Sequence, residues 1–271
     1  MKVRDLMTSP PLTIDENNDV ALGLQIMAWG DVRHLPVLRE GAVAGVVSER
    51  DLLANRQGNP RIGQVMTSPA HVAHPDEDIA EAARTMIGAR LGCLPVVEHN
   101  ELIGILTVTD LVAAAEGGAE TGRELRVPAR TAMTRVPITI SEGDFLLDAI
   151  RRMADGQVRH APVVDADLHV VGMLSDRDIR LALGATLFSD PDGPAAVKVR
   201  FLKVGEVMSR HPIVVHQSLP LGEAAAAFLH KGIGALPVVD DGEKIVGILS
   251  SVDVLRAFLE IRREPVVPVR A

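Results

Sequence analysis

The sequence predicts an α/β (α+β) fold made of four tandem copies of one unit, each with the element order β-α-β-β-α. Three observations predict it. A Met followed by Ser or Thr occurs four times, a helical stripe of small or apolar residues begins thirteen residues after each Met, and a glycine that opens a recurring motif follows each Met by 38 or 39 residues. The Met-Ser/Thr segments are Met7-Thr8, Met66-Thr67, Met133-Thr134 and Met208-Ser209.

Each unit is expected to start with a short strand followed by an amphipathic helix. The strand positions are Thr13-Ile14, Val72-Ala73, Thr139-Ile140 and Val214-Val215. Residues spaced i, i+3, i+4 and i+7 share one helix face, so a stripe with this spacing predicts a face that packs on a core. The four stripes are Val20/Gly23/Leu24/Met27, Ile79/Ala82/Ala83/Met86, Leu146/Ala149/Ile150/Met153 and Leu221/Ala224/Ala225/Phe228.

The second half of each unit is expected to be a hairpin and a second helix. A Pro-Val strand and a polar turn lead to a strand that ends in Gly-h-h-[Ser/Thr]-x-x-Asp, where h is apolar; we call this the exit motif. Its Ser or Thr is a favoured N-cap, so the last helix should begin there. A glycine inside a strand indicates that another group approaches the backbone closely. The exit motifs span Gly45–Asp51, Gly104–Asp110, Gly172–Asp178 and Gly247–Asp253.

These patterns place unit 1 at residues 1–57, unit 2 at 61–116, unit 3 at 128–185 and unit 4 at 203–262. Only 2% of the residues are aromatic and 47% are hydrophobic, so the core should consist of Val, Leu, Ile, Ala and Met. The formal net charge of −8 gives no global attraction to phosphate backbones, and we expect no nucleic-acid partner.

Cysteine content and hydropathy favour a soluble cytoplasmic protein. Cys93 is the single cysteine, which excludes an intrachain disulfide and fits a reducing compartment. No run of about 18 apolar residues occurs, and the first residues lack the pattern of a signal peptide. We therefore expect no membrane partner.

The repeated pattern resembles the CBS domain (cystathionine-β-synthase domain), in four copies that cover nearly the whole chain. The Met-Ser/Thr segment, the Pro-Val strand and the exit motif are present in all four units. The resemblance implies that units 1 and 2, and units 3 and 4, pair into two Bateman modules, which can form a disc. It also implies clefts between paired units for adenosine-containing ligands (AMP, ADP, ATP, NAD or S-adenosylmethionine), no catalytic cofactor, and a homo-oligomer or a regulated protein as partner.

The exit motif has the chemistry for such a ligand. A carboxylate one turn into a helix can accept hydrogen bonds from a ribose diol, and the hydroxyl and free N–H groups at the helix start can meet a phosphate. The alternative is purely structural, because an N-cap Ser and a first-turn Asp stabilise any helix.

The units differ in charge at two places. Units 1 and 3 carry Arg-His before the Pro-Val strand and an Arg just before the motif Asp, and a guanidinium suits phosphate because it donates two parallel hydrogen bonds. Units 2 and 4 have small or uncharged residues there, Gly92-Cys93 and Thr109, and Gly234-Ala235 and Val252. The sequence thus predicts one well-equipped site per module, contributed mainly by its first unit.

The candidate nucleotide-binding residues of unit 1 are Thr13, Ile14, Arg33, His34, Ser48, Arg50 and Asp51, and those of unit 3 are Thr139, Ile140, Arg159, His160, Ser175, Arg177 and Asp178. Weaker candidates are Thr107, Asp110, Ser250 and Asp253. Related adenylate-binding proteins contact phosphates with the order His-Arg, whereas this chain has Arg-His, and alternation along a strand leaves open which side chain points inward. The alternatives are solvated arginines, structural histidines and a first strand that is plain core.

The sequence gives little support for catalysis or a metal site. It has no Gly-x-x-x-x-Gly-Lys-Ser/Thr, His-Glu-x-x-His or Gly-x-Ser-x-Gly motif. His71, His74 and Asp76 lie close together without a Cys partner, so we expect no metal. The leading hypothesis is a non-enzymatic adenine-nucleotide sensor that signals to a partner by conformational change. The alternatives are an interaction scaffold with vestigial pockets and, third, a nucleotide hydrolase.

Overall fold

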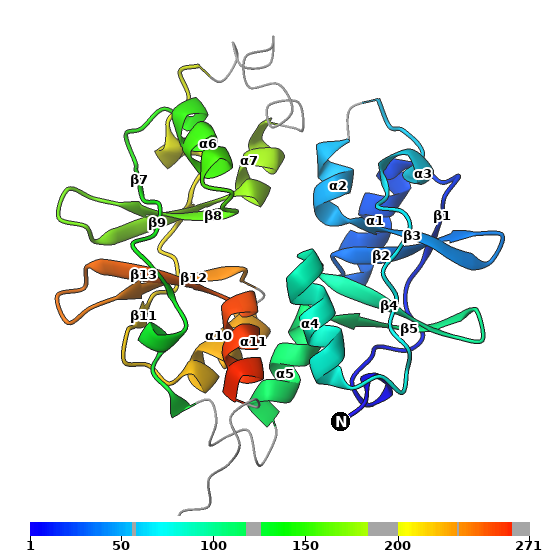
Figure 1. Ribbon diagram of the computed structural model, residues 1–271. Helices are drawn as coiled ribbons and strands as arrows, with labels where there is room; N and C mark the ends of the chain where they lie inside the picture. The colour runs from blue at the N-terminus through cyan, green and yellow to red at the C-terminus, as the bar shows by residue number, and fades with distance from the viewer. Residues whose placement is uncertain (56–57, 118–125, 184–199, 232, 262–271) are drawn as a thin grey trace, which may run out of the picture.

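The computed structural model describes residues 1–55, 58–117, 126–183, 200–231 and 233–261, and shows two pairs of units side by side (Figure 1). Units 1 and 2, blue to cyan-green, form the first module, and units 3 and 4, green to red, form the second. The last predicted residues of units 1, 3 and 4 lie outside the described residues. Within the described ranges, no helix is long and apolar enough to cross a membrane.

Units 1, 3 and 4 have the predicted order of elements, and unit 2 has it except for the first strand. Unit 1 contains β1 (Ile14–Asp15), α1 (Val20–Gly30), β2 (His34–Arg39), β3 (Ala42–Ser48) and α2 (Glu49–Ala54). Unit 2 contains α4 (Ile79–Ala89), β4 (Cys93–Glu98), β5 (Glu101–Thr107) and α5 (Val108–Gly117), after the short α3 (Ile62–Val65). Unit 3 contains β7 (Ile140–Ser141), α6 (Leu146–Asp155), β8 (His160–Val164), β9 (Val170–Ser175) and α7 (Asp176–Leu183). Unit 4 contains β11 (Val215–His216), α10 (Leu221–Lys231), β12 (Ala235–Val239), β13 (Ile245–Ser250) and α11 (Ser251–Ile261).

The strands confirm the predicted hairpins. In units 1, 3 and 4 the short first strand pairs in parallel with the Pro-Val strand, which pairs antiparallel with the strand of the exit motif. In unit 2 the first strand is reduced to one parallel bridge, between Ala73 and Val96. Each hairpin has an irregularity in register one or two residues after the proline.

The Met-Ser/Thr segments are exchanged between paired units, which the sequence did not indicate. In the second module, β6 (Thr134–Arg135) of unit 3 pairs with β13 of unit 4, and β10 (Ser209–Arg210) of unit 4 pairs with β9 of unit 3. In the first module the same exchange is made by single antiparallel bridges, from Thr8 to Ile105 and from Thr67 to Val46. Each sheet is therefore completed by its partner unit, which ties the two units of a module together.

The exit-motif glycines lie under these exchanged segments, which confirms the predicted close approach. A Cβ on Gly45 would lie 2.6 Å from the carbonyl oxygen of Thr67 and 2.7 Å from the Sδ of Met66. A Cβ on Gly104 would lie 2.6 Å from the Sδ of Met7. The methionine of each repeat thus packs on the glycine of its partner unit, and any side chain there would displace the exchanged segment.

The predicted helix stripes face the cores. All four stripe residues of α4, α6 and α10 are buried, as are Val20, Gly23 and Met27 of α1, while Leu24 is partly buried. Asp19 and Asp78 cap α1 and α4 by accepting hydrogen bonds from backbone N–H groups of the first turn. Capping and an apolar face together explain why these segments are helical.

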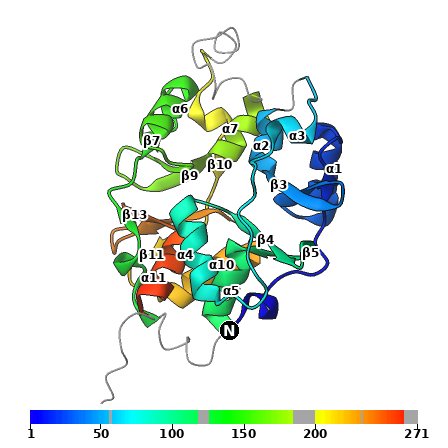
Figure 2. The same cartoon turned by 45° about the vertical axis from the view of Figure 1, so that its right-hand side comes forward.

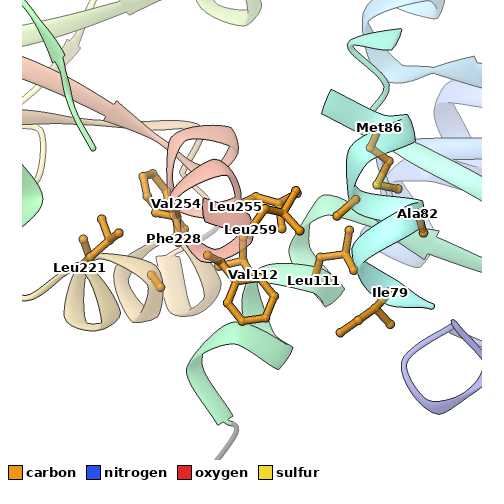
Figure 3. Close-up of a cluster of buried hydrophobic side chains, with 14 of the residues drawn as sticks. Ile79, Ala82, Met86, Leu111, Val112, Leu221, Phe228, Val254, Leu255 and Leu259 are labelled. Carbon is orange, nitrogen blue, oxygen red and sulfur yellow. The ribbon is translucent and has the colours of Figure 1, made fainter. Parts of the chain in front are cut away.

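The two modules meet differently at their two ends. At one end α5 of unit 2 packs on α10 and α11 of unit 4, and Val112, Phe228, Leu255 and Leu259 join one continuous core (Figure 3). At the other end α2 of unit 1 faces α7 of unit 3, while the cores of units 1 and 3 remain separate (Figures 1 and 2). Apolar burial therefore holds the modules together at units 2 and 4.

Candidate functional site

The serine or threonine and the aspartate of every exit motif form a reciprocal cap. One carboxylate oxygen of Asp51 accepts hydrogen bonds from the backbone N–H of Ser48 at 3.0 Å and from its hydroxyl at 2.6 Å, and the backbone N–H of Asp51 donates to the same hydroxyl at 3.3 Å. The same arrangement occurs at Asp110, Asp178 and Asp253. The structural role is thus present in all four units, and the carboxylate is held in a fixed orientation with its second oxygen, Oδ1, directed away from the cap.

The structure brings the charged motifs of units 1 and 3 into one neighbourhood. Burial lowers the pKa of both His34 and His160, and the charges of Arg33 and Arg159 lower both pKa values further, although the two histidines belong to different modules. Asp51 raises the pKa of His34, so these two residues of unit 1 lie near one another. The two predicted sites therefore face each other across the module boundary rather than lying apart.

Two ion pairs join these motifs across the boundary. Arg50 of unit 1 lies with its Nε 3.5 Å from a carboxylate oxygen of Asp176 in unit 3. Arg177 of unit 3 donates to Glu49 of unit 1 at 3.0 Å. Both arginines are about half exposed. The acidic partners immediately follow the N-cap serines and were not among the predicted site residues.

In each Arg-His pair the histidine points inward and the arginine outward. Arg33 and Arg159 are exposed, whereas His34 and His160 are partly buried. Burial lowers the pKa of His34 from its usual 6.5 to about 4, and it lowers that of His160 in the same direction. Both imidazoles are therefore neutral at pH 7. A neutral imidazole can hydrogen-bond a ribose or phosphate oxygen, but it brings no positive charge.

A small pocket opens beside Arg33 at this end of the module boundary. It has a volume of about 130 Å³ and combines an apolar wall from α1 with a polar rim. Its rim includes Asp31, Arg33 and Glu49 of unit 1 together with Arg177 of unit 3. The pocket therefore contains groups from both modules, and its shape depends on how α2 and α7 are placed.

The first strands would offer a ligand backbone groups rather than side chains. Ile14 and Ile140 are buried in the cores of units 1 and 3, and Thr13 and Thr139 are partly buried beside them. The carbonyl oxygen of Thr139 accepts a hydrogen bond from Arg152 at 2.6 Å. Plain core packing thus accounts for the isoleucines, as the alternative interpretation stated.

The strand exchange adds one residue that the sequence did not single out. Ser209 belongs to the Met-Ser segment of unit 4, yet its hydroxyl donates to Oδ1 of Asp178 in unit 3 at 3.4 Å. The sequence shows that Ser209 belongs to a Met-Ser/Thr segment. It does not show that Ser209 lies beside Asp178, because that contact depends on the exchange of segments between paired units. A ligand at Asp178 would therefore meet groups from both units of the module.

The weaker candidates in units 2 and 4 lie in different surroundings. Burial raises the pKa of Asp110, which is capped on Thr107, and Asp253, capped on Ser250, pairs with Arg256 at 3.4 Å. These motifs lie at the apolar end of the module boundary. No arginine directly precedes their aspartates, so the arginine found at that position in units 1 and 3 is missing there.

The single cysteine and the cluster around His74 lie outside these motifs. Cys93 is buried, and burial raises the pKa of its thiol to about 12, so it stays protonated. His74 and Asp76 come close to Glu98, but the guanidinium of Arg4 pairs with Asp76 at 2.8 Å and with Glu98 at 3.3 Å. An arginine thus already pairs with both carboxylates of this cluster.

Comparison with known proteins identifies the family. The CBS domain model matches residues 3–58, 62–117, 129–185 and 204–260. The chain therefore belongs to the CBS domain family, with four CBS domains in tandem and two modules of paired domains.

Several relatives share parts of this architecture. MJ1225 of Methanocaldococcus jannaschii is 30% identical over 190 residues, which cover 65% of this chain and 68% of the relative. Its crystal structure superposes with a TM-score of 0.76 at 23% identity, covering 95% of this chain and 100% of the other, which shows a shared fold. The chloroplastic CBS domain-containing protein CBSX2 of Arabidopsis thaliana is 34% identical over 135 residues, covering 43% of this chain and 56% of the relative.

Proposed function

We propose that this chain is a non-catalytic regulatory protein that binds an adenine nucleotide at the exit motifs of units 1 and 3 and signals to a partner through the angle between its modules. The observation that carries the proposal is the convergence of two equivalent motifs at one place. Each offers a fixed carboxylate, an inward histidine and an arginine beside it. Regulation by ligands is the general role of paired CBS domains.

The roles of the residues follow from their positions. The Oδ1 atoms of Asp51 and Asp178 would accept hydrogen bonds from a ribose diol, since the other oxygens are held by the caps. Arg50 and Arg177, which are half exposed, would turn toward phosphate oxygens. His34 would donate one hydrogen bond as a neutral imidazole. Adenine would lie near the first strands, where backbone groups are available.

A relative guides the choice of ligand. CBSX2 has been crystallised in complex with AMP, and another CBS domain pair, that of MJ0100, with 5-methylthioadenosine and S-adenosylmethionine. These findings concern those proteins. They make AMP and S-adenosylmethionine the first ligands to test here, alongside ADP, ATP and NAD.

The test is ligand-induced stabilisation measured by thermal unfolding and calorimetry. A ligand that binds only the folded protein should stabilise it by about 2.7 kcal/mol at a hundredfold excess over Kd. Asp51→Asn combined with Asp178→Asn should abolish most of this shift. The matched control is Asp110→Asn combined with Asp253→Asn, which removes identical caps where no arginine precedes the aspartate. If no ligand of the panel raises the melting temperature, or both pairs act alike, the assigned sites are wrong.

Two observations favour a different function, an interaction scaffold whose pockets are vestigial. Arg50 and Arg177 are already engaged by carboxylates, and Trp29 is 82% exposed on α1. An exposed tryptophan is typical of contact surfaces between proteins. This alternative predicts self-association or partner binding that nucleotides leave unchanged and that Trp29→Ala weakens. Sedimentation with and without AMP distinguishes the two functions.

A further inference from the structure

The two cross-boundary ion pairs form a reciprocal arrangement. The exit motif of unit 1 reads Ser48-Glu49-Arg50-Asp51, and that of unit 3 reads Ser175-Asp176-Arg177-Asp178. The acidic residue of each motif pairs with the arginine of the other, at 3.0 Å and 3.5 Å. Each proposed phosphate-binding arginine is therefore held by a carboxylate of the opposite module.

These carboxylates lie inside the proposed site. Glu49 and Asp176 are each two residues from the ribose-binding aspartate of their own motif, and Glu49 also lines the pocket with Arg33 and Arg177. Their side chains are 22% and 19% exposed, so they are more sheltered than the arginines they hold, which are 53% and 49% exposed. A phosphate that enters must take the guanidinium from a carboxylate and then remain beside that carboxylate.

The neighbouring charges make this competition costly for highly charged ligands. Asp176 pairs with Arg180 at 3.7 Å as well as with Arg50, so it is fixed in place. Like charges brought together repel, and the repulsion grows with each added phosphate. In units 2 and 4 the corresponding residues are Val108 and Ser251, which cannot act in this way.

On these grounds, and resting on the proposed function, we infer that Glu49 and Asp176 are specificity-determining residues that make the paired sites favour ligands of low phosphate charge over polyphosphates. They also link the two sites. A ligand that takes Arg50 from Asp176 leaves that carboxylate beside the site of unit 3, so occupation of one site changes the charge around the other.

The experiment measures AMP and ATP binding to the full chain by isothermal titration calorimetry. In the unmodified protein AMP should bind more tightly than ATP. The double variant Glu49→Gln, Asp176→Asn should bind ATP about tenfold more tightly, with a much smaller gain for AMP. Its folding is checked by melting temperature, and the single variant Glu49→Gln should give part of the same change.

The matched control is Glu81→Gln combined with Asp148→Asn. These two acids also pair with arginines, Arg84 and Arg151, on α4 and α6, and their loss changes the net charge by the same amount. The inference is overturned if the control changes the ratio of ATP affinity to AMP affinity as much as the double variant does. It is also overturned if both nucleotides bind and the double variant leaves that ratio unchanged. If neither nucleotide binds to any variant, the proposed function itself fails.

Discussion

The imidazole of His34 in unit 1 lies directly against the backbone of Gly92 in unit 2, where a Cβ would collide with its Nε2. His160 and Gly234 repeat this relationship in the second module, with a Cβ placed 2.6 Å from Nε2. The histidines of the odd units and the glycines of the even units therefore pack against each other. A large residue in one unit requires a glycine in its partner.

This match predicts strong coupling between the two positions. Gly92→Ala should destabilise the protein by about 1–3 kcal/mol, because the buried imidazole must move. In the presence of His34→Ala the same change should cost far less. A double-mutant cycle from denaturant unfolding measures the coupling, which should lie at about 0.5–3 kcal/mol. Additive effects would show that the two residues do not constrain each other.

The neutral state of His34 predicts that its contribution to stability depends on pH. Its pKa is about 4 in the folded protein and close to the usual 6.5 in the unfolded chain, so the unfolded chain takes up the proton first as the pH falls. Stability is therefore retained above about pH 7 and lost progressively down to about pH 4, by about 2 kcal/mol between pH 7.5 and pH 5.

The measurement compares unfolding free energies of the unmodified protein and His34→Gln across this range. Subtraction removes the carboxylates, which titrate in both proteins. The charges around His34 are those of Asp51, Arg33 and Arg159, and they are unchanged in the variant. If the difference between the two proteins does not change with pH, His34 is not held neutral by burial.

The exchanged segments predict that Gly45 tolerates no side chain. Gly45→Ala should cost about 1–3 kcal/mol, since the new Cβ meets a backbone oxygen that cannot move without breaking the bridge to Val46. The control is Gly88→Ala in α4, where a Cβ would have nothing within 4 Å. That change should stabilise the helix by about 0.5–1 kcal/mol. Thermal unfolding of both variants distinguishes a steric effect from a general preference for glycine.

Much of the fold could be predicted because it is encoded by local patterns. The stripe Ile79, Ala82, Ala83 and Met86 is buried as the helical spacing requires, and Ser48 caps α2 as its position before an acidic turn indicates. The close approach to Gly45 was also predictable from a glycine inside a strand. The group that approaches Gly45 could not be predicted, because it is Met66 of another unit and sequence spacing does not say which sheet a short segment joins.

The site was predictable in composition but not in arrangement. The sequence shows the Arg-His and Arg-Asp pairs of units 1 and 3. It does not show that these two units face each other, because that depends on which helices pack at the module boundary. By position, Glu49 and Asp176 are ordinary first-turn acids. Their role as partners of Arg177 and Arg50 arises only from tertiary structure.

The apolar end of the module boundary predicts that the modules unfold together. Leu255 of α11 is fully buried in the core that α5 and α11 share, and Figure 3 shows it between α11 and the helices of unit 2. Leu255→Ala should cost about 2–5 kcal/mol and separate thermal unfolding into two calorimetric transitions. The control Leu35→Ala removes an equally buried leucine on β2 from the core of unit 1 alone, so it should destabilise the first module without weakening the contact between modules. Because ion pairs exposed to solvent contribute little, the charged end cannot replace the lost apolar contact. A single transition in Leu255→Ala would mean that the charged end suffices to couple the modules.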